Sequence, residues 1–508
     1  MMKRLIVIVL VVLLLCGCGE TAAYVPTGNG LNEQGMTLPP DGQEEIVQNF
    51  SLAYDPAKTL NPYTCADYTN RALFSLIYQS LFVTDKDYVV YPQLCSSYRV
   101  SADMRSYTFY CERATFSDGT VLTVLDVAAS LEAARKSPVY EGRLRYVESI
   151  VLTQDGGVQV NLTTPYENLP LLLDIPIVKA GQVSNDFPLG TGPYALQGGA
   201  ANRRLRLRQD WWCKATLPVT AQSISLISTT SIKNIRDQFE LGAVGVVCAN
   251  PGADNYVDYR SDYNLWDCEN GVFLYLGCRY KSSVFNKDVV RQVLTHAIDR
   301  DALVQEYYRT FALPATLPAS PNSPYYNVAL ASRYGYDPEI FRQAVESEGF
   351  VGKNIVLLVN SADGRRTRVA QAIKVMLEDC GLKVTVKALA DSAYISALKN
   401  GQYDLHLGQT MLSPNMDLSA FYSSSGSLNY GGMSDEDIYS LCQDALANSG
   451  NYTALHQAVM EDAVLCPVAF LSYAVYVQPE LAEDFAPARD QVFFYHLGKT
   501  LDQIKIKD

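Results

Sequence analysis

The chain has 508 residues, of which 48% are hydrophobic, and it carries a formal net charge of −13 at pH 7. This acidic balance disfavours nucleic acid and anionic lipid as partners, because both carry negative charge. About 460 residues remain after the N-terminal segments, which is too many for one ordinary core and predicts two or three domains.

The first 17 residues are typical of an export signal. A basic start, Met1-Met2-Lys3-Arg4, precedes an unbroken apolar run from Leu5 to Leu15, and this order defines such signals. The run is too short for a permanent span, which takes about 20 apolar residues. It ends in Cys16-Gly17-Cys18, which resembles a bacterial lipobox, so we expect Cys18 to carry lipid. The alternative is an ordinary signal in which Cys18 is coincidental.

Residues 18–46 are rich in Gly, Pro, Thr, Asn, Gln and acids, and poor in apolar residues. Such a stretch cannot bury enough surface to offset the entropy lost on ordering, so it predicts a flexible tether. Beyond the tether, no run approaches 18 apolar residues. We therefore expect an extracytoplasmic body that is anchored to the cell membrane by lipid on Cys18.

Ten cysteines remain in the body once Cys16 and Cys18 are set aside. None shows C-x-x-C spacing, which disfavours a zinc site. An exported protein can form disulfides, but sequence alone does not determine pairing, and buried free thiols are the alternative. The pairs to check first are Cys95–Cys111, Cys268–Cys278 and Cys442–Cys466.

From about residue 47, short strands alternate with helices. The elements predicted in the first half are a strand over Ile46–Leu52, a helix over Asn70–Leu81, a helix from Thr123 to Ala134 with Asp126 as its capping-box partner, a hairpin of Ser149–Thr153 and Gly157–Leu162, and a strand over Leu205–Arg208.

The second half predicts a parallel α/β sheet. Its elements are a helix over Lys287–Ala297, a helix opened by Asp299, an irregular loop over Pro314–Pro324, a strand over Asn354–Asn360, a helix over Arg366–Cys380, a strand over Val384–Ala388, a helix over Ala393–Asn400 and a strand over Asp404–Leu407. Strands that alternate with helices are typical of parallel sheets. Ligands bind at the carboxyl ends of such strands, which places residues 408–417 beside a cleft.

Several stretches together resemble one family, the extracytoplasmic solute-binding proteins of peptide and nickel ABC importers (family 5). They occur in the family's order from about residue 50 to 480. The matching stretches are Leu60-Asn61-Pro62, Pro92-Gln93-Leu94 with Tyr98, Tyr107-Thr108-Phe109, Phe116-Ser117-Asp118-Gly119-Thr120-Val121, Gly190-Thr191-Gly192-Pro193-Tyr194, and Val290-Arg291-Gln292-Val293-Leu294 with Ala297-Ile298-Asp299-Arg300.

The resemblance implies an α/β fold with two periplasmic-binding-protein-like lobes, an extra subdomain and a ligand cleft between the lobes, which closes over the ligand. The implied divisions are a signal peptide at 1–17, a lipid-anchored tether at 18–46, lobe I at 47–268 with an inserted subdomain at about 90–185, lobe II at 269–480, and a C-terminal return to lobe I at 481–508. The Gly190–Tyr194 motif is expected to be architectural.

In peptide-binding members, the loop equivalent to 408–421 carries an aspartate that pairs with the ligand's α-amino group. Here the matching position falls at Ser413 or Pro414, and Asp417 is the carboxylate that the loop keeps. Either Asp417 binds the amine from a shifted loop, or this protein does not recognise a free amino terminus. A further alternative is that Asp417 only caps a helix over Leu418–Tyr422.

The family's layout also proposes Asn415, Asn429, Tyr430, Tyr473 and Tyr63 as ligand-binding residues. Amide side chains suit the backbone of a peptide, and tyrosine combines an apolar ring with a hydrogen-bonding tip. The alternative for each is an ordinary core or surface position.

Neither a metal site nor an enzyme is indicated. The four histidines, His296, His406, His456 and His496, lie far apart in the sequence, which disfavours a His-rich nickel site. The chain has no G-x-S-x-G and no phosphate-binding loop. We therefore expect no catalytic residues, no bound metal and no cofactor.

The function implied is capture of a small solute, an oligopeptide or dipeptide, for delivery to an ABC permease and ATPase complex, by a protein expected to be monomeric. One alternative is a peptide-sensing or signalling lipoprotein on the same scaffold. Another is a binder of a non-peptide solute such as a nickel chelate or a sugar.

Overall fold

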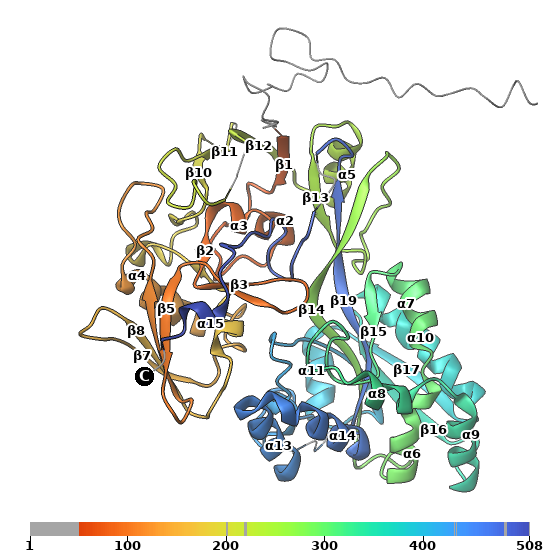
Figure 1. The fold of residues 1–508 in the computed structure, drawn as a ribbon. Coiled ribbons are helices and arrows are strands. Elements are labelled where there is room, and N and C mark those ends of the chain that lie inside the picture. Colours follow the sequence, from red (N-terminus) through yellow and green to blue (C-terminus); the bar gives the residue numbers. More distant parts are fainter. Residues whose placement is uncertain are drawn as a thin grey trace, which may run out of the picture. The chain divides into compact units, whose positions relative to one another are not determined.

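One large mixed sheet runs through the molecule (Figure 1). The computed structural model describes residues 50–199, 202–217, 221–430, 432, 434–481 and 485–506. The predicted signal peptide, Cys18 and the tether lie outside these residues. Apart from residues 221 and 222, the described residues belong to one compact unit, which spans Phe50–Val219 and Ser223–Asp508.

The strands of the large sheet within the described residues lie in the order β10 (Tyr194–Gln197), β11 (Arg204–Leu207), β12 (Ser223–Ser228), β1 (Phe50–Tyr54), β13 (Val246–Ala249), β19 (Leu465–Val477), β14 (Asn264–Cys278), β18 (Leu405–Met411), β16 (Asn354–Asn360) and β17 (Lys383–Leu389), with β15 (Ala312–Pro314) beside β19.

The two longest strands, β14 and β19, connect the two ends of this sheet. They pair antiparallel from Asn264↔Val477 to Gly277↔Leu465. At one end β19 also pairs with β13, and at the other end β14 pairs with β18. Figure 1 shows the two strands, green and blue, side by side between the regions that they join.

The first part of the chain adds smaller antiparallel sheets. Their strands are β5 (Cys95–Val100), β6 (Ser106–Cys111), β8 (Val158–Leu162) and β7 (Val147–Leu152) in one sheet, β2 (Gln79–Ser80) with β9 (Pro176–Ile177), and β3 (Phe82–Thr84) with β4 (Val90–Pro92). The predicted hairpin is confirmed as β7 and β8, with Gly156 at φ +86° in the turn. The helix α4 (Val124–Arg135) begins with the predicted Thr123–Asp126 capping box.

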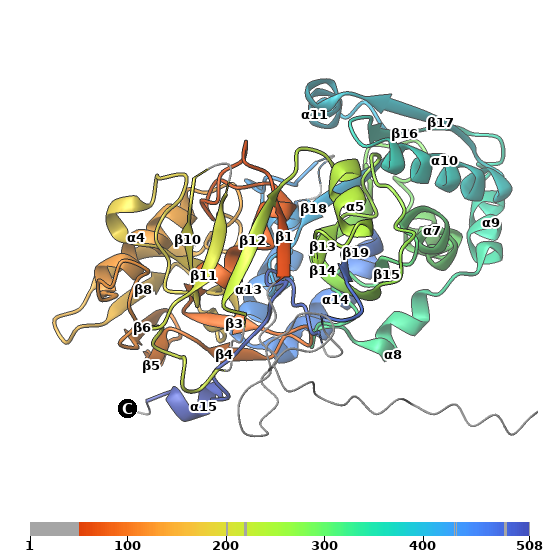
Figure 2. The ribbon, with the colours of Figure 1, turned by 90° about the horizontal axis from the view of Figure 1, so that it is seen from above.

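The predicted parallel unit is also confirmed. The strand β16 pairs parallel with β17 on one side and with β18 on the other. The connections are α10 (Gly364–Asp379) and α11 (Asp391–Lys399), and Figure 2 shows α10 running along the β16–β17 pair. Gly381 follows α10 at φ +100°, where glycine ends the helix at the least steric cost.

The remaining helices complete the described fold. They are α2 (Tyr68–Arg71), α3 (Phe74–Ile77), α5 (Ile232–Glu240), α6 (Asp288–Val293), α7 (Arg300–Tyr308), α8 (Val328–Ala331), α9 (Pro338–Ser347), α12 (Ser419–Tyr422), α13 (Glu436–Ala447), α14 (Tyr452–Asp462) and α15 (Leu501–Ile504), with 3-10 turns at Leu169–Leu172, Ala180–Gln182, Leu294–Ala297, Ser332–Tyr334 and Ser449–Asn451. Among the described residues, no helix has both the length and the hydropathy needed to span a bilayer.

The single helix predicted over Asn70–Leu81 is wrong. The segment forms α2, α3 and then the strand β2. The Asn70 side chain exchanges hydrogen bonds with the backbone of Asp55, at 2.9 and 3.0 Å, and so ties the first turn to the neighbouring loop. The carbonyl of Ile77 accepts from the N–H of Gly192 at 2.9 Å, and the chain is extended from Tyr78 onward.

The same contact explains the Gly190–Tyr194 motif. A Cβ at Gly192 would lie 2.5 Å from the carbonyl carbon of Ile77, and one at Gly190 would overlap the same peptide group. A side chain at either position would therefore push two backbone segments apart. This close approach gives the motif the architectural role expected from the sequence.

The C-terminal segment returns to the first part of the chain. Asp490 pairs with Arg71 at 3.2 Å, and Lys499 pairs with Glu112 at 3.1 Å. The Ile506 N–H donates to the Tyr98 carbonyl. These contacts join the described part of 481–508 to residues in the first part of the chain. The predicted return to lobe I and the predicted lobe boundaries remain predictions.

Candidate functional site

Three neighbouring cavities share the side chain of Arg489. The arginine cavity, of about 450 Å³, is defined by Arg71, Arg143, Arg145 and Arg489. The acidic cavity, of about 310 Å³, is defined by Asp85, Asp87, Asp174, Asp267 and Glu269. A small third cavity, of about 40 Å³, also has Arg71 and Arg489 in its wall.

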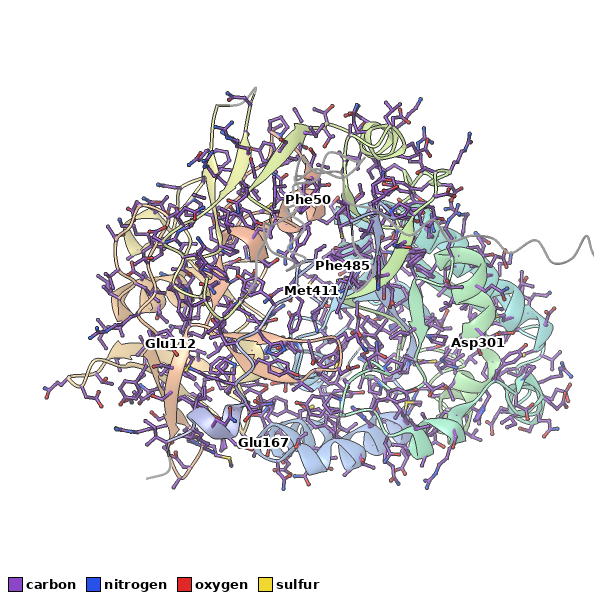
Figure 3. All side chains as sticks on the ribbon, turned by 45° about the horizontal axis from the view of Figure 1, so that its top comes forward. Phe50, Glu112, Glu167, Asp301, Met411 and Phe485 are labelled. Atoms are coloured by element: carbon purple, nitrogen blue, oxygen red, sulfur yellow. The ribbon has the colours of Figure 1, made fainter. Side chains whose placement is uncertain are left out.

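These cavities bring together residues that are distant in sequence. Arg71 ends α2, Arg143 and Arg145 lie between α4 and β7, and Arg489 follows β19. Met411, at the end of β18, lines two of the cavities. Figure 3 labels Met411 between Glu112 on one side of the view and Asp301 on the other.

Buried carboxylates hold two of the arginines in place. Arg143 contacts both Asp174 and Asp490, and Arg71 contacts Asp490 at 3.2 Å. Burial alone would raise the pKa of Asp490, but Arg143, Arg71 and Arg489 hold this pKa well below its usual range. Asp490 therefore stays ionised, and the guanidinium groups are fixed before any ligand arrives.

Arg489 has hydrogen-bonding capacity to spare. Its side chain is 7% exposed, and Nη2 donates to the carbonyl of Leu412. Its Nε and Nη1 atoms have no hydrogen-bond partner among the described residues, although Nε lies 4.0 Å from Oδ2 of Asp490. A buried donor without a hydrogen-bond acceptor is costly, so an anionic or carbonyl oxygen from a ligand is the natural complement here.

A glycine makes room for this guanidinium. Gly271 sits at a β-bulge of β14 with φ +71°, and a Cβ on it would overlap the Arg489 side chain. The Gly271 carbonyl also accepts from the Leu412 N–H at 3.0 Å. Direct contacts therefore connect the bulge, the loop after β18 and the Arg489 side chain.

Tyr473, one of the residues proposed from the sequence, supplies an aromatic surface to the arginine cavity. Its ring stacks on Tyr68 with centroids 5.5 Å apart. Burial raises the pKa of Tyr473, so its hydroxyl stays protonated. The ligand-binding role of Tyr473 itself remains a prediction.

Asp417 also lines the arginine cavity, with the neighbouring segment Thr410–Ser413. Its Oδ1 accepts from the N–H of Ser419 at 2.9 Å, and its Oδ2 lies 3.5 Å from Arg145. The helix α12 begins at Ser419 with Leu418 at its N-cap, so Asp417 binds the first N–H of the helix from the residue before the cap, alongside an existing basic partner. The amine-binding role of Asp417 remains a prediction.

The other proposed residues lie deeper or elsewhere. Tyr63 is 3% exposed and donates to the Pro176 carbonyl at 2.8 Å. Asn415 is 2% exposed, and its carbonyl accepts from the Tyr452 hydroxyl. Both have structural contacts of their own, and their ligand-binding roles stay predictions.

Asn429 and Tyr430 follow the serine-rich stretch. The Asn429 amide donates to the Ser423 carbonyl at 3.1 Å. The Tyr430 ring lies edge-on to His406, with centroids 6.2 Å apart. These two residues also remain untested as ligand contacts.

Sequence reasoning missed the arginines. None of the four lies in a recognisable binding motif, and their contribution depends on tertiary contacts between distant segments, such as that of Arg71 with Asp490. The one signal in the sequence was local, because Arg143 and Arg145 stand two residues apart in Gly142–Tyr146.

The histidines and cysteines are mostly interior. Burial lowers the pKa of both His406 and His456 to about 3. All ten body cysteines are free thiols, although Cys95 and Cys111 are register partners across β5 and β6. In the part of the chain that is described, no three His, Cys, Asp or Glu side chains gather as a metal-binding group.

The fold defines a class: a two-lobed, mixed α/β periplasmic-binding-protein-like fold with a central sheet, as predicted. Solved structures share it. NikA from Brucella suis with Fe(III)-EDTA aligns with TM-score 0.71 and 20% identity, over 87% of this chain and 98% of that one. The oligopeptide-binding protein AppA from Bacillus subtilis, in complex with a nonapeptide, aligns with TM-score 0.63 and 18% identity, over 89% and 99%.

The chain belongs to the bacterial extracellular solute-binding proteins, family 5, whose middle region matches residues 89–432. The family inferred from the motifs is therefore confirmed. Among curated relatives, the glutathione-binding protein GsiB of Salmonella choleraesuis (strain SC-B67) is 25% identical over 351 residues, which is 65% of this chain and 67% of the relative. The GsiB protein of Escherichia coli (strain K12) matches to the same extent.

Proposed function

We propose that this protein captures a short peptide with a free carboxylate and delivers it to an ABC permease and ATPase complex. The observation that carries the proposal is Arg489, a buried guanidinium whose Nε and Nη1 atoms lack a hydrogen-bond acceptor among the described residues, in the wall of the arginine cavity. A carboxylate matches the planar donor geometry of arginine and its charge.

The size of the cavities supports a small ligand. The arginine cavity has about 450 Å³ and the acidic cavity about 310 Å³, within the range of about 300–1,000 Å³ that is usual for small-molecule sites. The GsiB relatives are named for glutathione, a peptide, and the NikA structure contains Fe(III)-EDTA, a polycarboxylate chelate. Both ligands carry carboxylates, so a metal chelate is the second candidate.

The remaining parts of the proposal concern the setting of the site. The mature protein is anchored by lipid on Cys18, carries a tether over 18–46, and acts as a monomer without chemistry of its own. Lobe I at 47–268 and lobe II at 269–480 close over the ligand, and the permease distinguishes the closed state from the open one.

The test is ligand-induced stabilisation of the full chain in detergent, followed by calorimetry. Bound ligand raises the melting temperature by mass action. The probes are a pool of dipeptides and tripeptides, the same pool with C-terminal amides, a nickel–EDTA chelate and maltose. We expect the free-acid pool to stabilise the protein and the amidated pool to do so far less.

The matched variants are Arg489→Gln, which removes the charge from the cavity, and Arg342→Gln, which changes an exposed arginine on α9. We expect the first to lose the preference for the free-acid pool and the second to keep it. Equal stabilisation by acid and amide pools would show that no carboxylate is recognised. Stabilisation by maltose alone would overturn the peptide proposal.

A further inference from the structure

The acidic cavity holds more carboxylates than basic side chains. Asp85, Asp267 and Glu269 line it and form no ion pair within the residues that the structure describes. Glu269 accepts from the Tyr88 hydroxyl at 2.6 Å and from the Ser320 hydroxyl at 2.7 Å. These neutral donors orient the carboxylate without supplying a counter-charge.

The other carboxylates of this cavity already have partners. Asp87 faces Lys86 at 3.2 Å, and Asp174 is bound by Arg143. Burial and the adjacent Glu269 raise the pKa of Tyr88, so its hydroxyl stays a donor to that carboxylate. The cavity is therefore organised around Glu269 as an acceptor for a positive group.

A second feature points to an occupant. Arg489 lies in the wall of the acidic cavity as well as that of the arginine cavity, and its Nε and Nη1 lack a hydrogen-bond acceptor among the described residues. A group that brings a cation to Glu269 and an oxygen to Arg489 would satisfy both. A short peptide has this pair, in its ammonium group and its carboxylate.

The carboxylate expected from the sequence is less suited to this task. Asp417 already accepts from the Ser419 N–H and lies 3.5 Å from Arg145. An ammonium group there would compete with an existing guanidinium, whereas at Glu269 it would meet a carboxylate that has no ion pair among the described residues.

We propose that the acidic cavity binds the ammonium end of the ligand through Glu269, with Asp267 and Asp85 adding to the negative electrostatic potential of the cavity. The inference rests on the proposed function and gives the peptide a direction. Its amino end lies in the acidic cavity, and its carboxylate end contacts Arg489 on the side of the arginine cavity.

The experiment uses the full chain in detergent with a pool of tripeptides and the same pool N-acetylated. Dissociation constants for the strongest member of each pool are measured for the wild type, Glu269→Gln, Asp417→Asn and the control Glu346→Gln, an exposed position on α9. We expect Glu269→Gln to weaken the free-amine peptide at least tenfold and to leave its acetylated form unchanged. Asp417→Asn and Glu346→Gln should keep the preference for the free amine.

Asp267→Asn provides a second test that leaves the Tyr88 and Ser320 contacts in place, because both hydroxyls donate to Glu269 and Asp267 is exposed. It should weaken the free-amine peptide several-fold and spare the acetylated one. The melting temperature without ligand reports whether each variant is folded.

Three results would overturn the inference while leaving the proposed function standing. The wild type could bind free and acetylated peptides equally, Asp417→Asn alone could abolish the preference, or Ni²⁺ could stabilise the wild type and not Glu269→Gln, which would make the cavity a metal site. If neither pool binds the wild type, the proposed function fails and this inference fails with it.

Discussion

Replacing Gly271 with alanine tests whether the β-bulge of β14 positions Arg489. The residue has φ +71°, and a Cβ there would overlap the Arg489 guanidinium, whose Nη2 bonds the Leu412 carbonyl. The left-handed backbone costs a non-glycine residue about 1–2 kcal/mol. Loss of a hydrogen bond from a charged group adds about 1.5–3 kcal/mol. We therefore expect Gly271→Ala to lower the free energy of unfolding by about 3–5 kcal/mol.

The matched control is Gly119→Ala, in a turn with φ +83° where an added Cβ would have no atom within 4 Å. It carries the same backbone cost without the overlap, so we expect a loss of about 1–2 kcal/mol. Urea unfolding of both variants measures the difference. Calorimetry with the free-acid peptide pool should show weaker binding for Gly271→Ala only. Equal losses of stability, with unchanged peptide affinity, would refute the anchoring role of Gly271.

Three further predictions concern stability. Burial lowers the pKa values of His406 and His456 to about 3, whereas a histidine in the unfolded chain has a pKa of about 6.5. Below that pH the unfolded chain therefore binds more protons than the folded protein. Stability should therefore fall by about 2 kcal/mol per histidine from pH 7.5 to pH 5, and urea unfolding of His456→Leu should show a smaller loss. Asp490→Asn leaves buried guanidinium groups without their carboxylate and should cost about 3–5 kcal/mol; a melting temperature near that of the wild type would contradict this. Gly192→Ala places a Cβ 2.5 Å from the Ile77 carbonyl carbon and should cost about 1–3 kcal/mol in the same urea assay, whereas an unchanged midpoint would mean that the backbones separate freely.

Local patterns predicted the elements that local physics determines. The capping box at Thr123 and Asp126, the hairpin around Gly156 and the strand Asn354–Asn360 follow from neighbouring residues, and each is present. The prediction of one helix over Asn70–Leu81 was wrong because the Ile77 carbonyl accepts a tertiary hydrogen bond from the Gly192 N–H.

The site followed the same division. The sequence predicted a cleft beside residues 408–417, because strand ends in parallel sheets have a known position, and Thr410–Ser413 and Asp417 line the arginine cavity. The arginines could not be found in this way, because Arg71 and Arg489 meet only through the return of the C-terminal segment. Charged residues outside any motif can be assigned to a cavity only once the fold is known.

The position of Arg489 has a consequence for biosynthesis. It follows β19, the last strand of the large sheet among the described residues, and this sheet joins Leu52 to Val246 and Val246 to Val477. Contacts between such distant segments form slowly and only after most of the chain is present. A chain cut before Arg489 would thus lack the proposed carboxylate contact even where its early strands had paired.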